Sequence, residues 1–398
     1  MIRGSGLSKV FGDRWQDALD MARRGDSRQE VLRATGCTVA VNDVSFDVER
    51  GELFVVMGLS GSGKSTLVRL INRLISPSAG TIEIEGRDIS DMPEAELRAV
   101  RNRTLGMVFQ HFALFPHRTV RENAAYGLRV RGESEARSLE RAEWALHEVG
   151  LGDRGDAYPD ELSGGMKQRV GLARALATDA DVLLMDEPFS ALDPLIRRDM
   201  QDLLLKLQAE LRKTIVFITH DLNEAMRIGD RILLMKDGAR VQLGTSAEIL
   251  ASPADDYVAD FVADVDRTRV LTAEDVMRAP RFLAAPEEPA AELLRRLGRE
   301  EANGVYVLDD ERRIVGIARD DRLADAAARG AATPSRDCLS DEYLTTSPDK
   351  PLIELCSLVG RHSVPLAVID GDRRLLGVVP RATLLAALAS SNRTPTHA

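Results

Sequence analysis

The sequence contains little cysteine and no long apolar run. Three cysteines, Cys37, Cys338 and Cys356, stand far apart in the 398 residues. They predict neither a disulfide framework nor a metal-ligand cluster, and they are typical of a reducing cytosol. No stretch approaches about eighteen consecutive apolar residues, and the first residues lack an apolar signal segment. We therefore expect neither a spanning helix nor a secretion signal, and any membrane role must come through a partner.

The sequence also has fewer basic than acidic residues. The 53 lysines and arginines are outnumbered by 63 acidic residues, which gives a net charge of -10. This balance argues against non-specific nucleic-acid binding, because such binding needs a basic surface. The apolar content of 44% is typical of a globular protein, and the length suffices for two or three domains.

The segment Gly58-Leu-Ser-Gly-Ser-Gly-Lys-Ser-Thr66 fits the phosphate-loop pattern G-x-x-x-x-G-K-[ST]. An apolar run of strand length precedes it at residues 53–57, and apolar residues at helical spacing follow it at residues 67–74. Glycines let the backbone wrap around an anion, and a helix N-terminus directs N–H groups at it. Lys64 would reach the β- and γ-phosphates of a nucleotide, and the Ser65 hydroxyl would ligate Mg²⁺. The alternative is an ordinary Gly/Ser-rich turn. The predicted binding residues of this loop are Gly58, Ser60, Gly61, Ser62, Gly63, Lys64, Ser65 and Thr66.

Polar side chains follow three further apolar strands. Asp186 and Glu187 end the run at residues 181–187, where Asp186 would hold Mg²⁺ through water and Glu187 would polarise the attacking water. Alone, two such acids are more often a solvated turn or a helix N-cap. His220 follows the strand at residues 214–219 and would contact a γ-phosphate, although a lone histidine there is usually structural. Gln110 carries an amide able to touch both metal and water.

The segment at residues 162–168 opens a helix that we expect to run to about residue 177. Ser163, Gly164 and Gly165 would present a hydroxyl and backbone donors to an anion. A plain serine N-cap followed by flexible glycines is an equally good interpretation.

The chain order predicts an α/β sheet interrupted twice by helices. A short strand at residues 7–12 is followed by a helical insertion, whose second helix opens at the capping box formed by Ser27 and Glu30. A helical subdomain occupies about residues 112–177, and a hairpin turns at residues 237–238. Residues 307–317 match residues 368–378 at a constant offset, which indicates an internal repeat. We expect domains at residues 1–265, 266–330 and 331–398.

Five ordered motifs after the phosphate loop resemble those of the nucleotide-binding subunit of an ABC transporter. They are Gln110, residues 162–166, residues 181–187, residues 190–193 and His220. The insertion after Phe11, residues 193–197 and the doubled C-terminal module further resemble the ATPase of glycine betaine/proline-type osmoprotectant importers. The resemblance implies an α/β P-loop NTPase cassette with a helical subdomain, followed by an α+β module of tandem CBS (cystathionine β-synthase) domains. It also implies hydrolysis of ATP with Mg²⁺.

The resemblance assigns roles residue by residue. It makes Glu187 the general base, His220 the γ-phosphate sensor and Gln110 a residue of metal binding and coupling. Ser65 and Asp186 would hold Mg²⁺. Two residues, Ser163 and Gly165, would contact the nucleotide of a second copy of the chain, with Gly164 between them and Asp193 communicating between the sites. Phe11 would stack on adenine, with a packed core phenylalanine as the alternative.

The resemblance also implies partners and a location. A homodimer would drive a separate integral membrane permease, served by a substrate-binding protein, from the cytoplasmic face of the inner membrane. Arg319, Arg322, Pro380 and Thr383 replace the usual ribose-contacting pattern of CBS domains, so we do not expect AMP or ATP to be the regulator. The resemblance to osmoprotectant importers suggests ionic strength or a cyclic dinucleotide as the regulator. The rival functions are an ATPase for another solute importer, a soluble mechanical ATPase and a ligand-sensing module.

Overall fold

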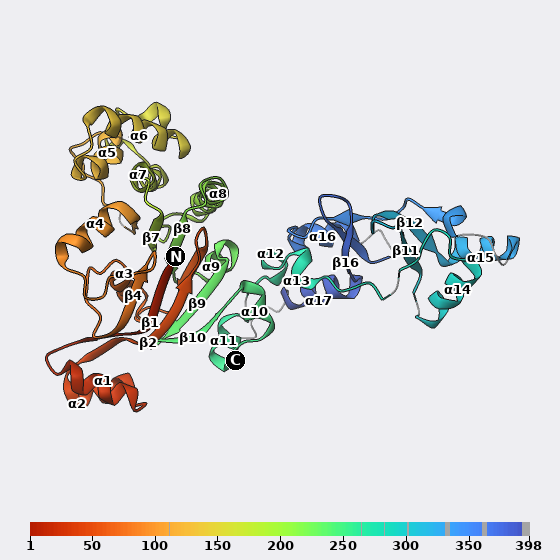
Figure 1. The fold of residues 1–398 in the computed structure, drawn as a ribbon, viewed down its shortest axis with the longest axis horizontal. Helices are drawn as coiled ribbons and strands as arrows, with labels where there is room; N and C mark the ends of the chain where they lie inside the picture. The colour runs from red at the N-terminus through yellow and green to blue at the C-terminus, as the bar shows by residue number, and fades with distance from the viewer. Residues whose placement is uncertain are drawn as a thin grey trace. The chain divides into compact units, whose positions relative to one another are not determined.

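The computed structural model describes residues 1–110, 112–263, 265–281, 283–300, 302–330, 335–359 and 364–391. The chain divides into two units, Met1–Ala259 and Asp260–Ala398 (Figure 1). The boundaries that the sequence suggested, at residues 265 and 330, stay a prediction, and the range 331–398 lies partly outside the described residues. No helix in the described part of the chain combines the length and apolar character needed to cross a membrane.

The centre of the first unit is a largely parallel sheet with strand order β10-β9-β3-β8-β7-β6. Its strands are β3 (Leu53–Met57), β6 (Leu105–Phe109), β7 (Val182–Asp186), β8 (Thr214–Thr219), β9 (Arg231–Lys236) and β10 (Ala239–Gly244). Every residue of β3 and β8 is buried, as expected for parallel strands covered on both faces. Because β3, β6, β7 and β8 run parallel, their carboxyl ends meet at one edge of the sheet. The apolar strands predicted at residues 181–187 and 214–219 are confirmed as β7 and β8.

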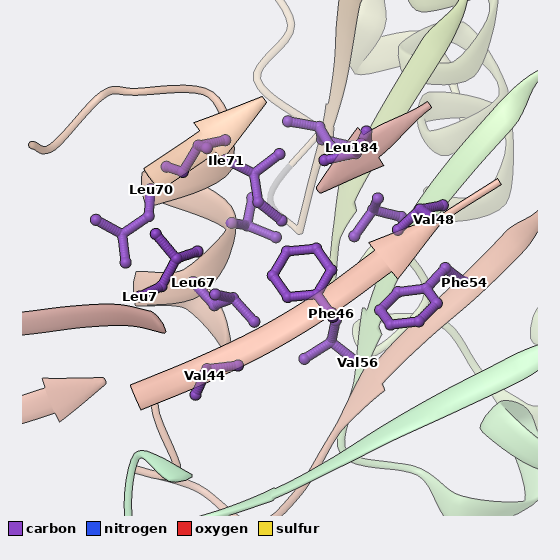
Figure 2. Close-up of a cluster of buried hydrophobic side chains, with 14 of the residues drawn as sticks. Leu7, Val44, Phe46, Val48, Phe54, Val56, Leu67, Leu70, Ile71 and Leu184 are labelled. Carbon is purple, nitrogen blue, oxygen red and sulfur yellow. The ribbon is translucent and has the colours of Figure 1, made fainter. Parts of the chain in front are cut away.

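A second, antiparallel sheet has the strand order β2-β1-β4-β5. Its strands are β1 (Ile2–Phe11), β2 (Thr38–Val48), β4 (Ala79–Ile84) and β5 (Arg87–Asp88). A shared core lies between this sheet, the parallel sheet and helix α3 (Lys64–Ile71), and Figure 2 shows Phe46 and Phe54 within it. The two rings are stacked with centroids 5.7 Å apart. The phosphate-loop helix is therefore packed against both sheets.

The first unit contains further helices, the last of which extends past the unit boundary at Ala259. They are α1 (Trp15–Arg23), α2 (Arg28–Thr35), α4 (Glu94–Thr104), α5 (Val120–Val130), α6 (Glu135–Glu148), α7 (Gly164–Ala177), α8 (Pro194–Leu211), α9 (Leu222–Ile228), α10 (Ser246–Ala251) and α11 (Asp256–Phe261), with short 3-10 turns at Gly152–Arg154 and Pro159–Glu161. Helices α5, α6 and α7 lie together as a helical subdomain within the predicted range (Figure 1).

The insertion after β1 is the hairpin of α1 and α2. The predicted capping box is confirmed, because the Ser27 hydroxyl accepts from the Glu30 N–H while the Glu30 carboxylate accepts from the Ser27 N–H. Gly36 ends α2 in the left-handed conformation, with φ of 72°. Val31 is fully buried in a small core with residues of α1, β1 and β2. The hairpin is thus fixed to the antiparallel sheet.

The second unit is built from two similar halves. Its elements are α12 (Arg267–Val270), α13 (Ala273–Val276), α14 (Ala290–Arg299), β11 (Gly304–Leu308), β12 (Ile314–Arg319), α15 (Asp320–Arg329), a 3-10 turn (Ser335–Cys338), β13 (Leu339–Ser340), β14 (Thr345–Thr346), α16 (Leu352–Val359), β15 (Leu366–Ile369), β16 (Leu375–Val379) and α17 (Arg381–Ser391). Hairpin β11–β12 corresponds to β15–β16, and both turns hold an arginine at φ of 64°, Arg312 and Arg373. Leu323 and Leu384 are buried at equivalent places. The predicted repeat is confirmed as a structural repeat.

Candidate nucleotide site

A cavity of about 530 Å³ lies over the loop that joins β3 to α3. Its walls are Arg28, Ala40, Leu59, Ser60, Gly61, Gly63, Lys64, Ser65, Thr66, Glu187 and His220. The volume is within the range usual for small-ligand sites. The structure therefore brings most of the predicted loop residues together with two polar residues that follow β7 and β8.

The loop is held by close backbone contacts that require glycine. A Cβ atom at Gly58 would lie 2.1 Å from the Met235 carbonyl oxygen, and one at Gly63 would lie 2.3 Å from the Ala40 carbonyl oxygen. Both residues also have positive φ, of 149° and 99°. In addition, the Gly238 N–H donates to the Ser62 carbonyl over 3.1 Å. Backbone from β2 and from the β9–β10 turn thus fixes the loop from outside.

Lys64 is the first residue of α3, and only 5% of it is exposed. Its Nζ donates to the carbonyl oxygens of Gly58 at 2.8 Å and Leu59 at 3.1 Å. Burial lowers the pKa of Lys64, while the nearby carboxylates of Glu187 and Asp186 act in the opposite direction. The carbonyl groups of the loop therefore bind the ammonium group of Lys64.

Ser65 and Asp186 meet between α3 and the end of β7. The Ser65 hydroxyl donates to Asp186 Oδ1 over 3.2 Å. Burial raises the pKa of Asp186, the hydrogen bond from Ser65 lowers it, and the charge of Glu187 raises it further. Gln110 directly follows Phe109, which is paired with Asp186 across β6 and β7. Hydroxyl, carboxylate and amide oxygens are ligands that Mg²⁺ accepts, so this donor set fits that ion.

Glu187 and His220 are in direct contact. Glu187 Oε2 lies 3.0 Å from His220 Nδ1. The Glu187 N–H donates to the Ile218 carbonyl over 3.0 Å, with Glu187 in the left-handed region at φ of 46°. This turn after β7 directs the carboxylate towards the residue that follows β8. A carboxylate oriented by an imidazole can accept a proton from water.

The second anion-binding candidate lies on other elements. Ser163 is exposed and caps α7, because its hydroxyl accepts from the Met166 N–H over 3.4 Å. Asp193 caps α8 in the same way, accepting from the Ile196 N–H over 3.1 Å. A Cβ atom at Gly165 would lie 2.4 Å from Ile196 Cγ2, so the starts of α7 and α8 pack tightly. Ser163 and Gly164 stand outside the walls of the cavity formed by the same chain.

Phe11 is 45% exposed at the end of β1, so its interpretation as a packed core residue is wrong. It pairs with Thr38, two residues before the cavity residue Ala40, and the Lys9 ammonium lies 5.2 Å from its ring centroid. Its stacking on adenine stays a prediction.

Arg28 is a cavity residue that sequence reasoning missed. The capping box predicted where α2 begins, but no motif indicated which part of the chain the helix start would face.

Comparisons with known proteins agree with this geometry. Residues 41–190 match the ABC transporter family, and residues 273–329 and 336–390 match the CBS domain. The glycine betaine transport ATP-binding protein OpuAA of Bacillus subtilis is 48% identical, covering 98% of this chain and 93% of the relative. The glycine betaine/proline betaine transport system ATP-binding protein ProV of Escherichia coli is 47% identical, covering 96% of both chains.

Solved structures show the same cassette. A dimeric post-hydrolysis structure of the ATP-binding cassette MJ0796 with ADP and phosphate is 32% identical, with a TM-score of 0.52, over 62% of this chain and 99% of that chain. The structure of cbiO1 from Clostridium perfringens, part of an ABC transporter complex, is 27% identical with a TM-score of 0.54, over 66% and 93%. The predicted fold class, ATPase activity and family are confirmed. The chain therefore belongs to the ABC transporter family, as an ATP-hydrolysing subunit similar to those of glycine betaine transporters, and it carries two C-terminal CBS domains.

Proposed function

We propose that this chain energises the import of glycine betaine or a related quaternary amine through a separate membrane permease. The observation that carries the proposal is the cavity in which the phosphate loop, Glu187 and His220 meet. Similarity to named betaine transport proteins over nearly the whole chain, CBS domains included, supports the choice of solute. A soluble mechanical ATPase would not be expected to share both halves with these relatives.

Within the site, we assign binding and catalysis to different side chains. Lys64 exchanges its two loop carbonyl partners for oxygens of the β- and γ-phosphates. Ser65, Asp186 and Gln110 hold Mg²⁺, which when bound neutralises charge on the phosphates. Glu187 accepts a proton from the attacking water, and His220, at 3.0 Å, orients the Glu187 carboxylate and reaches towards the γ-phosphate.

A second copy of the chain completes the site in this proposal. Ser163 and Gly164 are exposed at the start of α7, outside the cavity of their own chain, and Gly165 follows them as a buried residue of the same turn. The dimeric form of the solved cassette MJ0796 supports such pairing. The hydroxyl and N–H groups at that helix start would face the γ-phosphate held by the partner copy. Asp193, which caps the adjacent helix α8, would link the two sites.

The permease contact is placed at the segment from Gln110 to His117, of which residue 111 lies outside the described residues. Phe112 and Ala113 both have positive φ, of 55° and 48°, and the Arg174 guanidinium donates to the Phe112 carbonyl. Phe115 is half-buried, with its ring centroid 4.5 Å from that of Tyr126. The Arg118 guanidinium also lies 5.2 Å from the centroid of this ring, and we propose that the part of Phe115 that stays exposed meets the permease. The assembly would lie at the cytoplasmic face of the membrane and receive solute from a binding protein.

The CBS repeats are proposed to regulate transport in response to ionic strength or a cyclic dinucleotide. Two arginines at positions that usually contact ribose are engaged within the unit. Arg322 donates to the Leu339 carbonyl over 3.0 Å, and Arg319 lies 3.8 Å from Glu342. These contacts support the expectation that AMP and ATP are not the regulators.

Reconstitution tests the function. The chain, its permease and its binding protein are placed in vesicles, and ATP-dependent uptake is measured for glycine betaine, proline and choline. We expect uptake of at least one of these solutes and copurification of the chain with the permease from solubilised membranes. A chain that hydrolyses ATP but neither copurifies nor supports uptake of any of them contradicts the proposal.

A further inference from the structure

Arg28 places a cation from the α1–α2 insertion at the wall of the nucleotide cavity. It is the first residue of α2, and it lines the same cavity as Lys64, Glu187 and His220. Its Nη1 donates to the Gly61 carbonyl over 3.0 Å and lies 3.9 Å from Asp237 Oδ1. The insertion therefore reaches the tip of the phosphate loop, although it is far from the loop's own helix in sequence.

Local structure holds Arg28 in this position. The capping box of Ser27 and Glu30 fixes the start of α2, and the fully buried Val31 anchors the first turn in the core shared with β1 and β2. The Arg28 side chain is 28% exposed, so part of the guanidinium is accessible from the cavity. Asp237, at 74% exposure and beyond hydrogen-bonding distance, neutralises it only weakly.

We propose that Arg28 binds the triphosphate of ATP and so makes the insertion part of the nucleotide site. A guanidinium has five N–H donors, and the bond to Gly61 uses one, so donors remain for phosphate oxygens. Arginine suits this task because its planar fork matches two oxygens of a phosphate group. The inference rests on the proposed placement of the phosphates in the loop at residues 58–66.

The test compares the affinities of the full chain for ATP and for adenosine by titration calorimetry. Arg28→Ala should weaken ATP binding about tenfold, as expected for one charge-assisted contact, and adenosine binding by less than about twofold. Arg28→Gln keeps an amide able to reach the Gly61 carbonyl but removes the charge, so it should lose as much ATP affinity as the alanine variant. Arg28→Lys should recover part of the loss. Added salt should weaken ATP binding less in Arg28→Ala than in the wild type.

Arg33→Ala is the matched control, because Arg33 is an exposed arginine in the last turn of the same helix. It should bind ATP like the wild type. Wild-type ATP affinity in Arg28→Gln would show that Arg28 only braces the loop, and an equal loss for ATP and adenosine would show a contact with the adenine or ribose. Either result overturns the proposal. The Lys64→Ala variant separates failure of the Arg28 proposal from failure of the proposed function on which it rests. Normal ATP binding by Lys64→Ala would contradict the placement of the phosphates in the loop itself.

Discussion

The substitution Glu187→Gln tests the chemistry of the site most directly. The two side chains have the same length, so the backbone turn at φ of 46° and the contact with His220 Nδ1 are retained. The change removes the proton-accepting carboxylate. It also removes one of the two negative charges that oppose the lowering of the Lys64 pKa by burial.

The expected loss is large in turnover and small in binding. A positioned general base contributes roughly 10²–10⁴-fold to the rate. Its loss should therefore slow hydrolysis by that factor, which corresponds to an activation barrier higher by about 3–5 kcal/mol. ATP binding should be retained, because a negative charge beside the γ-phosphate disappears while Lys64 and the loop N–H groups remain. With ATP bound but not hydrolysed, the chain should accumulate as a dimer holding two ATP molecules.

Phosphate release and gel filtration with Mg-ATP measure the two effects. The control is Glu248→Gln, because Glu248 closes the capping box of α10 and glutamine serves equally well in that box. The control should hydrolyse ATP at the wild-type rate. Turnover of Glu187→Gln within about threefold of the wild type would refute its role as base, and a purely monomeric variant in Mg-ATP would refute the split site.

Three further predictions concern other parts of the first unit. Lys64→Ala should weaken ATP binding by about 2–3 kcal/mol in titration calorimetry, because two charge-assisted phosphate contacts are lost and only two carbonyl hydrogen bonds are released in exchange; an unchanged affinity would contradict the assignment. Phe115→Asp should lower solute uptake per ATP hydrolysed in vesicles and leave the isolated chain folded, and an unchanged ratio would place the permease contact elsewhere. Burial raises the pKa of Glu224, so its protonated form favours the folded state, and this stability is lost as the pH rises through the folded pKa. Glu224→Gln should therefore gain in melting temperature relative to the wild type as the pH rises above the ordinary glutamate pKa of about 4, and a pH-independent difference would exclude this titration.

The sequence predicted those features that depend on local chemistry. The capping box at Ser27 and the hairpin turn at Asp237 and Gly238 were confirmed, because each depends on residues close together in the chain. The C-terminal repeat was confirmed because its two matching segments form the same hairpin. The strand-end positions of Asp186 and His220 followed from apolar runs of strand length.

Features that depend on tertiary contacts were not predicted. Strand β1 begins at Ile2, five residues earlier than Leu7, although Gly4 and Gly6 are poor strand formers. In the fold β1 is central to its sheet and pairs with both β2 and β4, and this pairing outweighs the weak propensity. The Arg28 side chain was overlooked for a related reason, since helical periodicity identifies an apolar face but not what a charged helix start faces.

Because the phosphate loop is supported by neighbouring backbone, nucleotide binding does not have to supply the free energy that orders the loop. Gly63 and Gly238 both approach the Ala40 carbonyl too closely to admit a side chain, and the Asn42 N–H donates to the Gly238 carbonyl over 2.8 Å. Fixing the backbone of a free residue costs about 1–2 kcal/mol in entropy, and a loop ordered only by its ligand would subtract that cost from affinity. Here the cost is met when the two sheets fold, so binding and release of nucleotide do not require the loop to order and disorder in every cycle.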